Sequence, residues 1–157
     1  MTKVVVLDAG PLGAVTHPRA NTNWEIKEWL QALLRAGCVV LVPEIADYEV
    51  RRELLRAEKP KGVARLDSLK AIGYLPLSTN AMLKAAEYWA QARQEGLPTA
   101  SDEALDADVV LAAQAVILGN SSNSDVVIAT ANVGHLSRFV RAELWNDIRP
   151  EDCQIMC

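Results

Sequence analysis

The chain lacks the features that mark several broad classes of protein. Its 157 residues contain no run of 18 or more apolar residues, so no membrane-spanning helix and no membrane partner are expected. The first residues lead directly into a short apolar run, without a charged lead or a small-residue cleavage site, so no secretory signal is expected. No GxGxxG follows that run, which argues against a dinucleotide-binding fold.

Cysteines are few, and acidic residues outnumber basic ones by 20 to 16. The formal net charge is −4, which argues against a generally basic nucleic-acid binder but leaves room for an acidic metal site beside local basic patches. Cys38, Cys153 and Cys157 form no CxxC pair. An odd number of cysteines without a recognisable framework predicts a cytoplasmic, reducing location with buried or idle thiols.

The sequence is rich in apolar residues, since half of its residues are hydrophobic. That share predicts one globular domain over residues 1–157. Runs of strand type alternate with helical stretches, which predicts an α/β fold with a mainly parallel sheet of four to five strands, flanked by helices. The predicted strands are residues 4–7, 38–42, 74–77, 126–129 and a short one at 144–148. Helices are predicted from about residue 21 to Gly37, from Pro43 to about 55, and over about 62–72, 80–94, 101–118 and 136–144, with a polar loop at 119–124.

Asp8 is the most informative single residue. It directly follows the β-branched run of residues 4–7, which is typical of a buried central strand. Open α/β sheets bind ligands at the carboxyl ends of their strands. A lone buried charge at that edge is costly, so Asp8 needs a cation, a hydrogen-bond network or a functional role.

Further polar residues are predicted to gather at the same edge. Glu49 lies in PEIADYEVRREL after the second strand, and Asp108 lies in LDADVVLAAQA of the fifth helix. Nearby Asp102 and Glu103 fit helix capping better than a site. After the strand VVIAT stand Thr130, Asn132 and His135, and for His135 a surface or capping role is the simpler interpretation.

Carboxylates that converge in this way have the chemistry of a Mg²⁺ or Mn²⁺ site. Both ions prefer hard oxygen ligands, keep several waters and often share only a few carboxylates with a phosphate. Two such ions about 3.5–4 Å apart could activate water and stabilise the phosphoryl oxygens during an in-line displacement.

Residues 51–70 form a locally basic stretch, with seven basic residues against three acidic ones. Such a stretch could follow an RNA backbone, although a solvated helix face is the commoner explanation.

His17 stands in a predicted loop, where solvent exposure is favoured over a place in a substrate groove. Exposed tryptophans could stack on bases, whereas Trp29 fits the apolar face of the first helix and is predicted in the core. The other tryptophans are Trp24, Trp89 and Trp145.

Four segments in order give the chain a family resemblance. They are VVVLDAGPL, VPEIADYEVRREL, DADVVLAAQA and DVVIATANVGHLSRF, and together they cover about residues 4–139. With them the chain resembles a PIN domain, similar to the toxin ribonucleases of bacterial toxin–antitoxin pairs. The resemblance implies a three-layer fold and a Mg²⁺- or Mn²⁺-dependent ribonuclease that cuts single-stranded RNA. It also implies an antitoxin protein partner and a homodimer.

The resemblance assigns roles residue by residue. Asp8, Glu49 and Asp108 match the family's catalytic and metal-binding acids, and Asn132 would complete the metal site. Asp106 lies about 200° around an ideal helix from Asp108, so the two cannot face one ion equally. Residues implied in supporting roles are Asp106, Thr130 and His135 around the site, and Arg51, Arg52 and Arg56 as RNA contacts.

Three departures from the family pattern keep alternatives open. Asn132 replaces a frequent aspartate, His135 replaces an acidic residue, and Gly10-Pro11 replaces a polar residue followed by an aliphatic one. The alternative is therefore a weak or inactive PIN domain that acts as an RNA-binding or protein-interaction module. A phosphoryl-transfer enzyme with Asp8 as nucleophile fits less well, because that chemistry needs a second aspartate at position 10.

Overall fold

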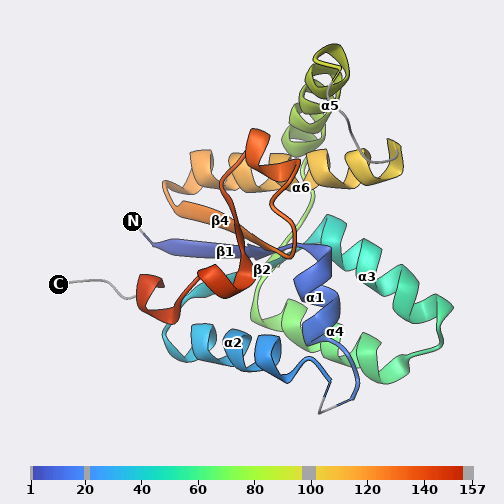
Figure 1. Cartoon of the computed structure of the whole chain (residues 1–157), viewed down its shortest axis with the longest axis vertical. Coiled ribbons are helices and arrows are strands. Elements are labelled where there is room, and N and C mark those ends of the chain that lie inside the picture. The colour runs from blue at the N-terminus through green and yellow to red at the C-terminus, as the bar shows by residue number, and fades with distance from the viewer. Residues whose placement is uncertain (1, 20–21, 97–101, 154–157) are drawn as a thin grey trace.

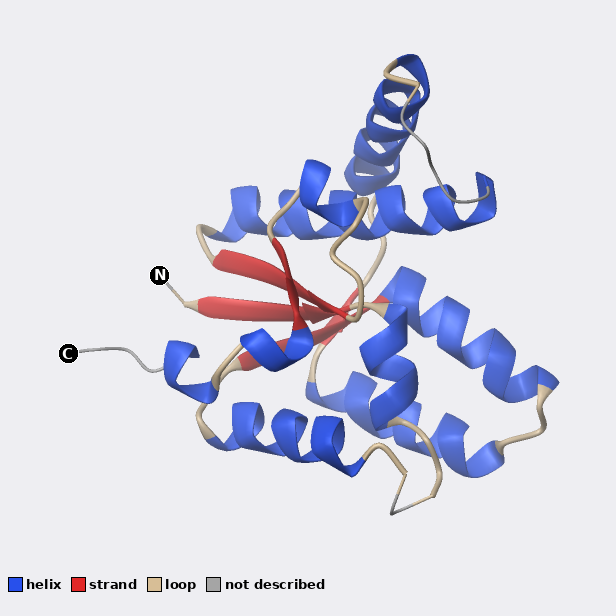
Figure 2. Cartoon of the chain, in the orientation of Figure 1, coloured by secondary structure: helices blue, strands red, loops and turns tan. Residues whose placement is uncertain are grey.

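The computed structural model describes residues 2–19, 22–96 and 102–153, and of Asp102 and Glu103 it describes the backbone only. Five parallel strands form one sheet in the order β3-β2-β1-β4-β5, with helices on both faces (Figures 1 and 2). This α/β architecture confirms the predicted fold class. The strands are β1 (Lys3–Leu7), β2 (Val39–Pro43), β3 (Tyr74–Leu75), β4 (Asp125–Thr130) and β5 (Ala142–Leu144).

The helices connect these strands in the order that a parallel sheet requires. They are α1 (Ala9–Val15), α2 (Trp24–Arg35), α3 (Glu44–Arg56), α4 (Pro60–Ile72), α5 (Thr79–Gln94) and α6 (Asp102–Ser122). Short 3-10 turns follow in the last part of the chain, namely η1 (Leu136–Arg138), η2 (Trp145–Asp147) and η3 (Pro150–Cys153).

Successive side chains of β1 point alternately to the two faces of the sheet and contact the helix layer on each face. Val5 and Leu7 point into a core formed with α1, α2 and α4, whereas Val4 and Val6 face α6 on the other side. All four side chains are buried, as expected for a central strand with both faces covered. Helix α5 packs against α6 through small residues and lies farther from the sheet than α6 (Figure 1).

The strand order places a topological switch point between β1 and β4. From β1 the chain builds outward through β2 and β3, and it then returns to add β4 and β5 on the other side of β1. Val5 pairs with Val40 on one side and with Val127 on the other. In open α/β sheets the crevice beyond the strand ends at such a point is where ligands bind, and Asp8 and Thr130 lie there.

A buried amide holds α6 in place over the sheet edge. Gln114 is 2% exposed. Its amide nitrogen donates to the Leu75 carbonyl at 3.0 Å, and its amide oxygen accepts from the Ile45 backbone N–H at 3.5 Å. One side chain of α6 thereby contacts both the end of β3 and the start of α3.

By length and composition alone, the segment Ala104–Ser122 of α6 could cross a membrane. The same composition is expected of a core helix, and α6 packs on the sheet and on α5. The finding is therefore weak evidence for a membrane segment.

Several predicted boundaries are wrong. Helix α1 was not predicted, because AGPLGAV is short and rich in glycine and proline; the Asp8 cap and burial of Leu12 and Val15 stabilise it. The predicted loop at 119–124 is helical as far as Ser122. The predicted helix at 136–144 is one 3-10 turn followed by β5, and the strand predicted at 144–148 is mostly the turn η2.

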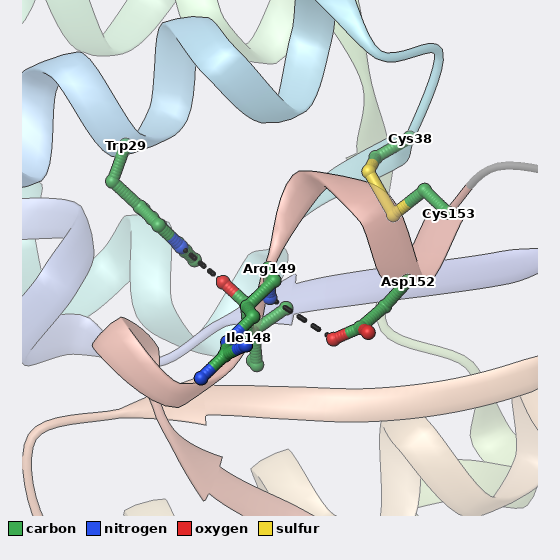
Figure 3. The surroundings of a disulfide bond; sticks show 6 residues. All are labelled: Trp29, Cys38, Ile148, Arg149, Asp152 and Cys153. Carbon is green, nitrogen blue, oxygen red and sulfur yellow. Dashed lines mark hydrogen bonds between the residues drawn. A yellow bond between two sulfur atoms is a disulfide. The ribbon is translucent and has the colours of Figure 1, made fainter.

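The prediction of idle thiols is wrong for two of the three cysteines. Cys38 and Cys153 form a disulfide whose Cα atoms are 5.2 Å apart, and it joins the start of β2 to η3 (Figure 3). Next to it, the Trp29 indole N–H donates to the Ile148 carbonyl at 2.8 Å, and the Trp29 and Trp145 rings pack edge to face. Trp29 is buried, as predicted. The third cysteine, Cys157, lies outside the described residues.

The disulfide spans 115 positions of the chain, so it restricts the unfolded state strongly. Reducing it with dithiothreitol, or replacing both cysteines in a Cys38→Ser/Cys153→Ser variant, is expected to lower the free energy of unfolding by about 2–5 kcal/mol. Urea denaturation with and without reductant measures the change, and Cys157→Ser is the control that keeps the bond. Equal stability of the oxidised and reduced parent protein would contradict a structural role for this bond.

Candidate active site

Asp8 is held rigidly at the switch point. It is the N-cap of α1, where its Oδ1 accepts from the Ala9 backbone N–H at 2.7 Å. Its Oδ2 accepts from the Thr130 hydroxyl at 2.7 Å, and its own backbone N–H donates to the Ala129 carbonyl at 3.0 Å. The carboxylate therefore joins the ends of β1 and β4 and has lone pairs left for a further partner.

Glu49 and Asp108 approach Asp8 from two different helices. Glu49 lies in α3, which follows β2, and Asp108 lies in the first part of α6. Burial raises the pKa of Glu49 above its usual value, and the negative charges of Asp8 and Asp108 raise it further, against the Arg52 guanidinium. Burial and the Asp8 charge raise the pKa of Asp108 to about 6, against an opposing effect of His135. The three carboxylates thus interact electrostatically, as groups that converge on one cleft do.

Asp106, two residues before Asp108, is not among the charges that shift the pKa of Glu49 or of Asp108. Asp106 is exposed and lines two shallow hollows, one with Met82 and Trp89 of α5 and one beside Tyr48 and Glu49. The side chains of Asp102 and Glu103 lie outside the described residues.

The loop after β4 is organised by a turn around Asn132. Its backbone N–H donates to Thr130 Oγ1 at 3.1 Å, and its side-chain Oδ1 accepts from the Gly134 N–H at 3.0 Å. A Cβ at position 134 would lie 3.0 Å from the same oxygen, so glycine suits this turn. The Asn132 side chain is therefore exposed and occupied by its own loop.

His135 follows that turn and directly precedes η1. The next residue, Leu136, is 2% exposed and packs with Leu111 and Ala112 of α6 in one core cluster. Among the described residues, His135 Nδ1 is the one buried side-chain polar atom that has no hydrogen-bond partner. His17, by contrast, is a loop residue whose Nδ1 accepts from the Arg19 backbone N–H at 3.2 Å.

The three arginines predicted to contact RNA have different surroundings. Arg51 forms ion pairs with Asp47 at 2.9 Å and with Asp67 at 2.7 Å, so it joins α3 to α4. Arg56 pairs with Glu53 at 2.7 Å. Arg52 lies over the Tyr48 ring, 5.0 Å from its centroid, and is the cation that faces Glu49.

Two hollows flank Glu49 and Arg52. One of about 510 Å³ lies between α1 and α3, with Ala9, Gly10 and Gly13 on one wall. The other, of about 240 Å³, lies between α3 and α6 and reaches Asp106 and Val110. Glu49 and Arg52 line both, so an extended ligand that passes from one hollow to the other would cross these two side chains.

The donor set fits a divalent cation that keeps part of its water shell. In the described part of the chain, no three His, Cys, Asp or Glu side chains stand close enough to chelate an ion directly. Mg²⁺ and Mn²⁺ are usually held by few carboxylates and several waters, so three partly exposed carboxylates suit them. A cation would also offset the repulsion that raises the pKa values of Glu49 and Asp108.

The fold matches a set of solved structures along nearly its whole length. FitAcB from Neisseria gonorrhoeae matches with a TM-score of 0.65 and 20% identity, over 92% of this chain and 99% of that chain. VapBC2 from Rickettsia felis, bound to a promoter DNA fragment, matches with a TM-score of 0.65 and 16% identity, over 90% and 98%. DNA-bound VapBC from Salmonella typhimurium matches with a TM-score of 0.62 and 19% identity, over 92% and 99%.

These structures are toxin–antitoxin complexes whose toxins are PIN domains. The chain has the PIN-domain fold. No protein-family model matches the sequence. No curated protein matches it significantly.

Sequence reasoning missed two features of the site. Asp47, in the same motif as Glu49, is buried and binds Arg51 and Lys70, so it holds α3 to α4. Its spacing of four residues from Arg51 on a helix was the available signal. The Asn132 turn was also missed, although an asparagine two residues before a glycine is a frequent turn signal.

The raised pKa of Asp108 has a consequence for stability. Since its folded-state pKa of about 6 lies above the ordinary aspartate value of 3.8, the folded protein binds the proton more tightly than the unfolded chain between these values, and stability falls as pH rises from about 4 to 6. In metal-free buffer, Asp108→Asn should remove this loss and gain about 1–2 kcal/mol at neutral pH, after discounting for partial exposure. Urea denaturation at pH 4 to 8 measures it, with Asp106→Asn as control. Parallel pH curves for the two variants would contradict the assignment.

Proposed function

We propose that this protein is a metal-dependent endoribonuclease that cleaves single-stranded RNA, in the manner of the toxin of a toxin–antitoxin pair. One observation carries the proposal. The charges of Asp8, Glu49 and Asp108 act on one another and raise the pKa values of Glu49 and Asp108, and these residues lie at the switch point of a PIN fold. Three separate elements supply these carboxylates, and none pairs with a lysine or arginine through an ion pair among the described residues. A structural role alone would not favour such an arrangement.

Asp8, Glu49 and Asp108 would hold Mg²⁺ or Mn²⁺. When bound, the ion would supply Lewis-acid stabilisation of the phosphoryl oxygens and lower the pKa of water. The Thr130 hydroxyl fixes the Asp8 carboxylate, and the α1 backbone fixes its other oxygen, so this ligand needs no reorientation. Attack of water on phosphorus with departure of the 3′ oxygen would leave a 5′-phosphate and a 3′-hydroxyl.

Cleavage of a mixed single-stranded RNA pool with Mn²⁺ or Mg²⁺ tests this proposal. Asp8→Asn keeps the cap of α1 but removes the charge, and it should lower the cleavage rate by about 100-fold or more. Glu49→Gln should do the same, whereas its control Glu53→Gln, one helical turn away and paired with Arg56, should leave the rate within about twofold. No metal-dependent cleavage by the parent protein, or equal cleavage by Asp8→Asn, would refute the proposal.

Arg52 would bind an RNA phosphate, because its charge lies between the two hollows beside Glu49. Arg52→Ala in the Asp8→Asn background should weaken RNA binding about 5- to 10-fold and reduce the slope of log K against log salt by about one. Fluorescence anisotropy at several salt concentrations measures both values. Arg56→Ala is the matched control, since Glu53 already neutralises that arginine. Equal losses in the two variants would show a diffuse basic surface instead.

The main alternative is a PIN domain that binds RNA without cutting it. Asn132 supports this alternative, since it brings no charge and its side-chain oxygen is engaged by Gly134. RNA binding without metal-dependent cleavage in the same assays would establish it.

An antitoxin-type partner and a homodimer belong to the same proposal. The similar solved structures are two-component VapBC and FitAB complexes, which supports a protein partner. Met82, Leu83 and Trp89 of α5 are exposed apolar side chains that a second copy of the chain could cover. A cytoplasmic location is retained as part of the proposal, although disulfides such as Cys38–Cys153 are uncommon in mesophilic cytosols.

A further inference from the structure

The hollow of about 240 Å³ between α3 and α6 lies directly beside the proposed cleavage site. Glu49 and Arg52 line it, and the same two side chains line the larger hollow on the α1 side. An RNA chain with one phosphate bound to Arg52 would therefore bring a neighbouring base to the smaller hollow. Contacts in this hollow are in a position to choose among the four bases.

The lining of this hollow combines apolar side chains with a few polar groups, as binding sites for organic molecules usually do. The apolar side chains are those of Ile45, Ala107 and Val110, of which Val110 is buried. Tyr48 of α3 and Asp106 of α6 add polar groups, and both residues are exposed. A flat heterocycle with polar edges matches such a mixture.

Tyr48 supplies a ring on which a base can stack. The Arg52 guanidinium lies over this ring, 5.0 Å from its centroid, and yet 57% of Tyr48 remains exposed. Proteins hold the unpaired bases of single-stranded nucleic acid with exposed aromatic rings and neighbouring arginines. Tyr48 and Arg52 provide both elements in adjacent turns of one helix, next to Glu49.

Asp106 supplies a hydrogen-bond acceptor that the proposed metal centre does not use. It forms no ion pair with a lysine or arginine in the described part of the chain, and it lines the hollow with Tyr48. The two oxygens of a carboxylate can accept from two adjacent N–H donors at once, as they do from arginine.

Guanine is the base whose edge matches that acceptor. Its Watson–Crick edge carries two adjacent donors, N1–H and the 2-amino group. On the same edge, adenine and cytosine carry one amino group beside an acceptor, and uracil carries one N–H between two acceptors. This edge is free only in an unpaired base, which is the form that single-stranded RNA offers to proteins.

We propose that the hollow between α3 and α6 binds one unpaired guanine of the RNA substrate, stacked on Tyr48 and recognised by Asp106. The inference rests on the proposed function, because it assigns a base preference to the RNA that the metal centre would cut. It gives Asp106 a role in recognising RNA in place of a supporting role at the metal. Since Glu49 and Arg52 line the same hollow, the recognised base belongs to a nucleotide close to the cleaved bond.

Fluorescence anisotropy with metal-free Asp8→Asn protein measures the base preference apart from cleavage. The probes are two labelled single-stranded RNAs, one with a single guanosine in an all-uridine background and one with inosine, which lacks the 2-amino group, at that position. The guanosine RNA should bind about tenfold more tightly. Adding Asp106→Ala should reduce this ratio to within about twofold, whereas Glu28→Ala, which removes an exposed acid from α2, should preserve it. The ratio is the readout because loss of any negative charge strengthens binding of every RNA.

The stacking role of Tyr48 is tested in the same background. Tyr48→Ala should weaken binding of both RNAs about tenfold, and Tyr48→Phe should restore it because the ring is kept. Leu55→Ala is the control on the same helix, since Leu55 is 61% exposed and does not line the hollow, and it should change binding by less than about twofold.

The outcomes separate this inference from the proposed function. Equal binding of the two RNAs, or a guanosine preference that survives Asp106→Ala, would overturn the guanine subsite and leave a nuclease standing if the parent protein cleaves RNA. A guanosine preference that Asp106→Ala abolishes, in a parent protein without metal-dependent cleavage, would support the subsite and refute the nuclease. Unchanged RNA binding by Tyr48→Ala with an altered oligomeric state in analytical ultracentrifugation would overturn the subsite and show that a second copy of the chain covers the hollow.

Discussion

The hydrogen bond from the Thr130 hydroxyl to the Asp8 carboxylate is the interaction on which the candidate site depends. It joins the ends of two strands whose positions in the sequence are 122 residues apart. Parallel pairing of β1 with β4 makes this bond, because Leu7 and Ala129 are in register and the residue after each lies at the same edge. The bond also sets the start of the loop that carries Asn132 and His135. A shift in that register would separate the carboxylate from the loop.

Around this point the structure separates residues that support the fold from residues that face the cleft. On α3, Asp47 and Arg51 form a partly buried ion-pair network with α4, whereas Glu49 and Arg52 line the two hollows. On α6, Gln114 holds the helix to β3 and α3 by hydrogen bonds, while Asp108 faces the other carboxylates. Each helix therefore has one set of side chains that fixes its position and another that faces the cleft.

The C-terminal part of the chain stabilises the layer of the fold that contains α2. The Cys38–Cys153 disulfide and the hydrogen bond from Trp29 to Ile148 hold η3 and the segment before it against β2 and α2 (Figure 3). This covalent and aromatic contact lies at the amino-terminal end of β2, whereas the carboxylates gather at the carboxyl ends of the strands. The disulfide and the Trp29 contact therefore lie away from the edge where like charges accumulate.

The sequence by itself determined the parallel α/β architecture and the edge at which the acids gather. Apolar, β-branched runs such as residues 4–7 favour a strand covered on both faces, and the residues directly after parallel strands lie at one edge of the sheet. The tertiary structure decided the rest. It showed that α1 exists, that Cys38 meets Cys153, that Arg51 is committed to ion pairs and that Asn132 is turned into its own loop. The Arg51 ion pair with Asp47 and the Asn132 turn had local signals, in a spacing of four residues on a helix and in an asparagine two residues before a glycine. The disulfide depends on a partner 115 positions away in the chain, and local residue patterns carry no information about such a pairing.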